Sequence, residues 1–286
     1  MRDRERSRSK LRQTINGELT KFALRRIQHL AEASRRVDPD GGDQTDASLR
    51  DAVVRSFEAL YDPAQEGDRP DADTRRSIVN QFHRLYYHDS QNTWRNTSYR
   101  GVPIMKCPLD LWQYQEVISA LRPDLIIETG IADGGGAYYL GDLCDTVGNG
   151  RVVSIDIELA SVLPDHDRVT YLKGSSISPE IVAKVRALAP PDGTIMVILD
   201  SDHSRDHVRR ELEMYAPMVT VGSYAIVEDT NVHGHPALPS YPPGPMEGLR
   251  DFLNGTDAFE IDRNCERFMM TFNPSGYLRR LRPDPD

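Results

Sequence analysis

The sequence of 286 residues predicts an α/β protein built on a mostly parallel, doubly wound, Rossmann-like sheet. Short apolar runs alternate with stretches in which apolar residues have helical spacing, as parallel sheets with crossover helices require. In residues 125–140 a strand-like run leads through a glycine-rich turn into a helix. Several apolar runs also end in an acidic residue, which places the acids together at the carboxyl edge of the sheet.

Composition excludes several classes of protein. An apolar content of 38% and a mean hydropathy of -0.54 predict a soluble chain, and no apolar run approaches the roughly 18 residues of a membrane helix. The first ten residues lack the apolar segment of a secretory signal, so we expect a cytoplasmic protein. A net charge of -9 argues against a nucleic-acid partner. Three widely spaced cysteines argue against a disulfide framework or a cysteine metal site.

Residues 1–73 are predicted to form an N-terminal helical extension with linkers. Apolar residues fall at helical spacing in 15–30 and again in 49–60, and both segments are followed by stretches rich in Pro, Gly and Asp. The apolar stripes would pack on the main domain or on a second subunit. A homo-oligomer formed through these helices is therefore one hypothesis.

Residues 74–115 are predicted to form a lid or substrate-side segment. A helix is expected over 74–87, and the residues between it and Pro108 are expected to be irregular. The segment is dense in aromatic residues beside polar ones. This pattern suits an amphipathic ligand such as a sugar, and it suits equally well a lid packed on the core.

Residues 116–286 are predicted to form the sheet-containing domain, entered by a helix that starts at Pro108. Five strands are expected to alternate with helices, and two antiparallel strands are expected to close the sheet. The expected strands are 125–128, 152–156, 169–176, 194–200 and 223–229, the helices are 179–188, one from about Ser204, and 245–254, and the closing pair lies in 259–273 and 276–281.

The turn after the first strand predicts a nucleotide-like ligand. Glu128 closes the strand, and Gly130 and Gly134 follow in the order E-x-G-x-x-x-G. A dinucleotide fingerprint would instead be G-x-G-x-x-G with its acid about 20 residues later. The order found here resembles motif I of class I S-adenosylmethionine methyltransferases. The alternative is a glycine-rich turn of an α/β protein that binds no ligand.

Two further positions extend this prediction. Asp156 ends the second strand, where it would accept hydrogen bonds from both ribose hydroxyls. Ser176 ends the third strand, where methyltransferases commonly contact the adenine.

Asp200 and the pair Glu228–Asp229 predict a metal site. Each acid follows an apolar run, and neighbouring strands lie about 4.8 Å apart. Carboxylates this close repel one another unless a cation lies between them. Oxygen ligands favour Mg²⁺, or Mn²⁺ or Ca²⁺, over zinc. The alternative is helix capping by Asp200 and solvated loop acids at 228–229.

His203 follows Asp200 by three residues, near the start of the next helix. Its imidazole titrates near neutral pH, which suits a general base that removes the proton of a metal-bound hydroxyl. The alternative is a surface or capping histidine. The roles of four polar neighbours stay open: Asp202, His207, His233 and His235.

Several separated motifs resemble the rhamnosyl O-methyltransferase / "cephalosporin hydroxylase" family. They are TSYRGVPIMKCPLDLWQYQEVI, ILDSDHSRDHV, VEDTNVHGHP with PSYPPGP, and ERFMMTFNPSGYLRR, and the resemblance covers roughly residues 80–280. It implies a class I fold and a divalent-metal-assisted methyl transfer from S-adenosylmethionine to a hydroxyl of rhamnose or a related deoxysugar, free as a nucleotide sugar or attached to a natural product.

The resemblance also implies roles for particular residues. Asp200, Glu228 and Asp229 would hold the metal, with His203 as the base. The residues implied for the cofactor are Glu128, Gly130, Gly134 and Asp156.

Two rival functions fit these residues less well. An oxidoreductase is disfavoured by the glycine spacing, and none of the eight histidines begins the H-x-D/E run typical of an iron site. A non-catalytic partner that only binds the cofactor would not need the acids or His203.

Overall fold

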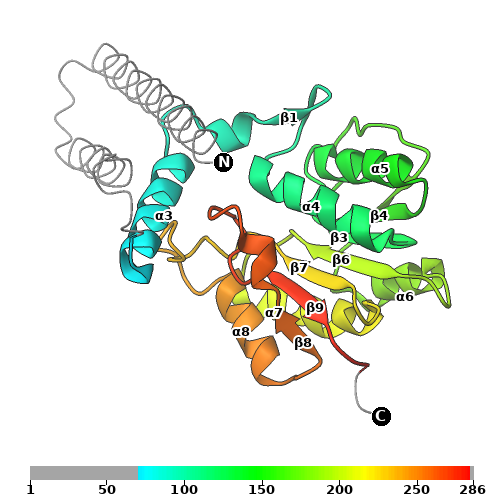
Figure 1. Ribbon diagram of the computed structural model, residues 1–286. Helices are drawn as coiled ribbons and strands as arrows, with labels where there is room; N and C mark the ends of the chain where they lie inside the picture. The colour runs from blue at the N-terminus through cyan, green and yellow to red at the C-terminus, as the bar shows by residue number, and fades with distance from the viewer. Residues whose placement is uncertain (1–69, 284–286) are drawn as a thin grey trace, which may run out of the picture. The chain divides into compact units, whose positions relative to one another are not determined.

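The computed structural model describes residues 70–283. Within them, a seven-stranded sheet has the order β5-β4-β3-β6-β7-β9-β8. The strands β5, β4, β3, β6 and β7 run parallel, and β9 runs antiparallel to both of its neighbours, β7 and β8 (Figure 1). The predicted doubly wound sheet with a closing antiparallel pair is confirmed. The strands are β3 (Leu125–Thr129), β4 (Arg151–Asp156), β5 (Val169–Lys173), β6 (Ile195–Leu199), β7 (Tyr224–Val227), β8 (Phe259–Ile261) and β9 (Tyr277–Arg280).

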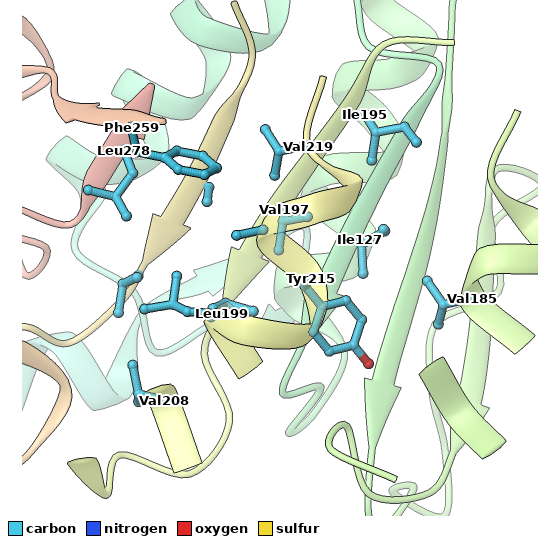
Figure 2. Close-up of a cluster of buried hydrophobic side chains, with 14 of the residues drawn as sticks. Ile127, Val185, Ile195, Val197, Leu199, Val208, Tyr215, Val219, Phe259 and Leu278 are labelled. Carbon is cyan, nitrogen blue, oxygen red and sulfur yellow. The ribbon is translucent and has the colours of Figure 1, made fainter. Parts of the chain in front are cut away.

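Helices cover both faces of this sheet. Successive strand residues point to opposite faces, so Ile126 and Ile127 belong to different hydrophobic clusters. Ile126 packs with α4 and α5, whereas Ile127 packs with α6, α7 and α8. Figure 2 shows the second cluster, in which Tyr215 of α7 lies against the strands. The helices are α4 (Pro108–Leu121), α5 (Gly135–Val147), α6 (Pro179–Leu188), α7 (Arg205–Tyr215) and α8 (Pro245–Asn254).

The segment predicted to be irregular contains regular structure. After α3 (Ala72–Tyr87) come the short helix η2 (Thr93–Asn96) and a hairpin of β1 (Ser98–Tyr99) and β2 (Val102–Pro103). Positive φ values of 49° at Arg100 and 85° at Gly101 form its two-residue turn, as hairpins of this kind require. Strands of two residues are too short to show an alternating pattern, which is why the sequence did not predict them.

The chain divides into two compact units, residues 1–82 and 83–286. The helices predicted at 15–30 and 49–60, and with them the proposed oligomer contacts, lie outside the described residues. The domain boundaries predicted at 73 and 115 stay predictions. None of the helices in residues 70–283 combines the length and apolar character needed to cross a membrane.

The parallel register brings four strand ends level with one another. Thr129 is paired with Ile155 on one side and with Leu199 on the other, and Leu199 is paired with Val227. Backbone hydrogen bonds continue past the strands, because the amide of Asp200 donates to Thr129 (2.9 Å). Asp156 at the end of β4, Asp200 after β6 and the acids after β7 therefore emerge at one edge of the sheet.

Candidate active site

A cavity of about 440 Å³ lies at this carboxyl edge. Its volume is within the range of small-molecule sites. The glycine turn, the ends of β4 and β6, residues 103–106 and Trp94 all contribute to its wall. The cavity therefore brings together residues that are far apart in the sequence, from Trp94 to Asp229.

The two predicted glycines have different surroundings. Gly130 lines the cavity with φ +89°, and a Cβ there would lie 1.8 Å from the carbonyl oxygen of Asp200. Glycine is therefore required for β3 to end against β6. Gly134 is not among the lining residues; it has φ +86°, and a Cβ there would lie 2.6 Å from Pro164. Its predicted contact with a cofactor stays a prediction, and its local packing already explains the glycine.

Asp156 braces the glycine turn. Its Oδ2 accepts hydrogen bonds from the backbone amides of Ile131 (2.8 Å) and Ala132 (3.4 Å), and its Oδ1 accepts one from Glu158 (3.1 Å). The carboxylate also lines the cavity. Oδ1 accepts only one of these bonds and can accept a second, so Asp156 retains capacity for a ligand hydroxyl.

Glu128 lines the same cavity, and one of its two carboxylate oxygens lacks a hydrogen-bond partner among the described residues. It is buried, and its Oε2 accepts a hydrogen bond from Ser154 (2.6 Å). Its buried Oε1 has no hydrogen-bond partner among the described residues. Burial is the main cause that raises the pKa of Glu128, to about 7. Buried polar atoms are normally paired, so Oε1 marks a place for a ligand donor.

Ser176 belongs to a polar network on the cavity wall. Its hydroxyl lies 3.1 Å from Nε2 of His207, which also lies 3.2 Å from the Ser201 hydroxyl. Ser201 donates to the buried Glu211 at 2.7 Å. A hydrogen bond with Glu211 is the main cause that raises the pKa of His207. The structure thus places His207, whose role the sequence left open, beside the predicted Ser176.

Asp200, His203 and Asp229 converge in the cavity. One potential ligand atom from each lies within 4.8 Å of the others. Nε2 of His203 is 2.8 Å from Oδ2 of Asp229 and 4.0 Å from Oδ1 of Asp200. Burial lowers the pKa of His203, but the hydrogen bond and charge of Asp229 outweigh it and raise that pKa to about 9. Asp229 also has φ 52°, a left-handed conformation uncommon outside glycine.

Glu228 is joined to Asp200 through Lys106. It is buried, it is not among the cavity-lining residues, and its Oε1 accepts a hydrogen bond from Nζ of Lys106 at 2.6 Å. Lys106 also donates to Oδ2 of Asp200 at 2.6 Å. Two of the three predicted metal ligands therefore share this lysine. Metal binding by Glu228 stays a prediction.

Lys106 is the functional candidate that sequence reasoning missed. Burial lowers the pKa of Lys106, but the charges of Asp200 and Glu228 outweigh it and raise that pKa well above its ordinary value. It lies 94 residues before Asp200, inside the motif TSYRGVPIMKCPLDLWQYQEVI, but neither helical nor strand periodicity marks it. A second signal was indirect, because an edge with so many acids needs a cation.

Of the three remaining residues whose roles the sequence left open, one lines the cavity and two do not. Asp202 lines the cavity and accepts a hydrogen bond from the amide of Ser204 (2.8 Å). His233 stacks on Tyr241, and Nε2 of His235 lies 2.7 Å from Glu247. Neither histidine is among the lining residues.

A second group of metal-type side chains is neutralised by arginines. Asp142, Asp145 and His166 lie together on and beside α5. Arg100 pairs with Asp142 at 2.7 Å, and Arg168 pairs with Asp145. The hydroxyl of Tyr99 also donates to Asp142 at 2.9 Å, so this cluster fastens the β1–β2 hairpin to α5.

The family model described as "Rhamnosyl O-methyltransferase/CmcI" matches residues 91–281. The chain belongs to the rhamnosyl O-methyltransferase/CmcI family. This confirms the resemblance found in the sequence.

Two curated relatives are similar to about two thirds of this chain. The rhamnosyl O-methyltransferase of Mycobacterium tuberculosis (strain ATCC 25618 / H37Rv) is 36% identical over 197 residues, which cover 65% of this chain and 79% of that protein. The rhamnosyl O-methyltransferase of Mycobacterium leprae (strain TN) is 34% identical over 197 residues, 65% of this chain and 84% of that protein.

Solved structures of the CmcI type share the fold. The structure described as "cmcI-D160 Mg-SAM" has a TM-score of 0.51 at 19% identity and covers 77% of this chain and 84% of that chain. The structure described as "cmcI-N160 SAH" has a TM-score of 0.50 at 19% identity and covers 66% of this chain and 84% of that chain. These similarities confirm the predicted class I methyltransferase fold.

Proposed function

We propose that this protein is an S-adenosylmethionine-dependent, divalent-metal-assisted O-methyltransferase that acts on a deoxysugar hydroxyl. Family membership supports the reaction class, and the relatives named above are rhamnosyl O-methyltransferases. The observation that carries the proposal is the convergence of Asp200, His203 and Asp229 in the cavity that the glycine turn also lines.

The cavity wall fits S-adenosylmethionine. Glu128 offers an unpartnered buried oxygen, and Asp156 has spare acceptor capacity toward hydroxyl groups. Gly130 brings backbone to the wall, and Ser176 supplies a hydroxyl. These four residues would hold the cofactor, and the acidic wall favours its sulfonium charge.

The acid cluster fits a hard divalent cation. Asp200 and Asp229 offer carboxylate oxygens close enough to share one ion, and oxygen ligands suit Mg²⁺. Glu228 would join them as the third ligand. When bound, the metal lowers the proton affinity of the acceptor hydroxyl, and S-adenosylmethionine supplies the methyl group.

His203 would remove the proton of the acceptor hydroxyl. It lines the cavity, and the charge of Asp229, whose Oδ2 lies 2.8 Å from Nε2, would stabilise the imidazolium that forms. The cavity wall holds the acceptor in line, and such alignment is worth about 7–11 kcal/mol of the barrier in well-oriented reactions.

The wall next to these groups suits a sugar acceptor. Trp94, Ile104 and Met105 contribute aromatic and apolar surface, while His203 and Asp229 contribute polar groups. A 6-deoxyhexose has one apolar face and neighbouring hydroxyls, and it matches both. The acceptor is nucleotide-activated or already attached to a natural-product scaffold.

Two measurements test this function. Calorimetry should show binding of S-adenosylhomocysteine and no binding of NAD(H) or 2-oxoglutarate, which an oxidoreductase would require. Labelled S-adenosylmethionine incubated with deoxysugar nucleotides and rhamnosides should yield a methylated product by mass spectrometry, and EDTA should abolish it. Cofactor binding without methylation of any acceptor would favour the non-catalytic alternative.

A further inference from the structure

Lys106 holds two acids of the active site at once. Its Nζ lies 2.6 Å from Oδ2 of Asp200 and 2.6 Å from Oε1 of Glu228, and its side chain is 7% exposed. Asp200 thus divides its carboxylate, with Oδ2 on Lys106 and Oδ1 toward His203 (4.0 Å). Two of the three acids predicted to hold the metal already share a protein cation.

The position of Lys106 is fixed by its surroundings. It follows the β1–β2 hairpin, which Tyr99 and Arg100 fasten to α5 through Asp142. A Cβ at Gly136 would lie 3.0 Å from Cε of Lys106, so the helix start has room for this lysine because a glycine faces it. The lysine is therefore a fixed part of the site.

We propose that Lys106 is a resident cation of the acid cluster that competes with the divalent metal for Asp200 and Glu228. This inference rests on the metal-assisted function proposed above. Without Lys106, three carboxylates at one sheet edge would repel one another whenever no metal is bound. With Lys106 in place, part of this negative charge is compensated without a metal, and a metal must share Asp200 and Glu228 with the lysine.

The competition has a defined sign. Coupling between two bound species is reciprocal, so a cation that weakens metal binding is itself displaced from these carboxylates by the metal. Removal of Lys106 therefore strengthens Mg²⁺ binding and makes the fold depend more on Mg²⁺. If Lys106 only ordered the acids for the metal, its removal would weaken Mg²⁺ binding.

The test compares Lys106→Met with wild type and with Lys184→Met. Lys184 pairs with Glu180 on the exposed surface of α6 and serves as the matched control. Each metal-stripped protein is titrated with MgCl₂ at constant ionic strength, and the dissociation constant and the Tm are measured. Without Mg²⁺, we expect Lys106→Met to have a lower Tm than wild type, and Mg²⁺ should raise its Tm by more. Its dissociation constant for Mg²⁺ should be lower by roughly tenfold or more. Lys184→Met should match wild type.

Unchanged or weaker Mg²⁺ binding by Lys106→Met, with normal binding by wild type, overturns the competition and leaves the proposed function intact. Absence of Mg²⁺ binding in both proteins overturns the metal-assisted function and this inference with it. If Lys106→Met does not fold, Glu228→Gln is compared with the double variant Lys106→Met/Glu228→Gln. Tighter Mg²⁺ binding by the double variant supports the competition, and equal or weaker binding overturns it.

Discussion

Nε2 of His203 lies 2.8 Å from Oδ2 of Asp229. His203 lies in the loop after β6, and Asp229 lies directly after Glu228 at the end of β7. Their contact therefore depends on the parallel pairing of these two strands. Asp229 reaches the histidine from a left-handed backbone conformation, and its backbone amide donates a hydrogen bond to Oδ1 of Asn273 (3.1 Å). The histidine is therefore oriented by a residue with a constrained backbone.

Replacement of His203 by Gln should lower the rate of methyl transfer by roughly a hundred- to ten-thousand-fold, the range typical of a lost general base. Binding of S-adenosylhomocysteine, measured by calorimetry, should stay within about twofold of wild type, because the proposed cofactor contacts do not include this ring. His88, which is exposed directly after α3 and does not line the cavity, provides the control, and His88→Gln should retain activity. Full activity of His203→Gln would remove this residue from the mechanism.

Gly130→Ala should prevent the normal junction of β3 and β6. Its Cβ would meet the Asp200 carbonyl at 1.8 Å, and φ is +89°. Gly222 has φ +88° with nothing within 4 Å of an added Cβ, so Gly222→Ala measures the backbone strain alone. We expect Gly222→Ala to cost on the order of 1–2 kcal/mol of unfolding free energy and Gly130→Ala clearly more. Equal losses in urea denaturation would contradict the close approach.

Trp94 should report acceptor binding by fluorescence. The chain has two tryptophans, and Trp112 is 59% exposed on α4, so Trp112→Phe leaves Trp94 as the single emitter. Trp94 lines the cavity, stacks on Tyr87 at 5.0 Å and carries the guanidinium of Arg95 at 4.9 Å from its ring. A bound glycoside excludes water from the indole, so emission should shift to the blue. Trp94→Phe, which retains Trp112, should show no shift.

Asp110 should make stability depend on pH. Its buried carboxylate accepts hydrogen bonds from Thr271, the Phe272 amide (2.8 Å) and the Tyr277 hydroxyl (2.8 Å). Burial outweighs these bonds and raises the pKa of Asp110 from 3.8 to about 6. The folded state therefore holds this proton more tightly than the unfolded chain. The contribution is fully present below pH 3.8 and is lost as the pH rises through about 6.

The matched variant is Asp110→Asn, which cannot ionise. Between about pH 4 and pH 6.5, the unfolding free energy of wild type should fall relative to that of Asp110→Asn, by at most a few kcal/mol, since one pKa unit corresponds to about 1.4 kcal/mol. Urea denaturation at a series of pH values measures this difference. A constant difference across the range would show that Asp110 does not titrate there.

The strand ends were predictable because the signal is local. Asp200 directly follows five buried apolar residues of β6, and Asp156 ends β4. Parallel pairing then converts adjacency in the sheet into adjacency of these acids. Sequence patterns thus predicted both the fold and the convergence of Asp200 with Asp229.

Contacts across long sequence separations were not predictable. Lys106 is 122 residues from Glu228, and its segment shows no helical or strand period. The predicted set of three acids therefore did not include the lysine that bridges Asp200 and Glu228. Gly134 was assigned to the cofactor because of its place in the motif, whereas its contact with Pro164 depends on a loop whose path no local pattern reveals.

The cavity draws its walls from two sources. Trp94, Ile104 and Met105 come from the segment that precedes α4, whereas Glu128, Gly130 and Asp156 belong to the sheet and its first turn. Loops tolerate substitution better than the scaffold that carries them. The proposed acceptor contacts and the proposed cofactor contacts therefore lie in separate stretches of the chain, so exchange of residues 93–105 between members of the family should change the acceptor without changing cofactor binding.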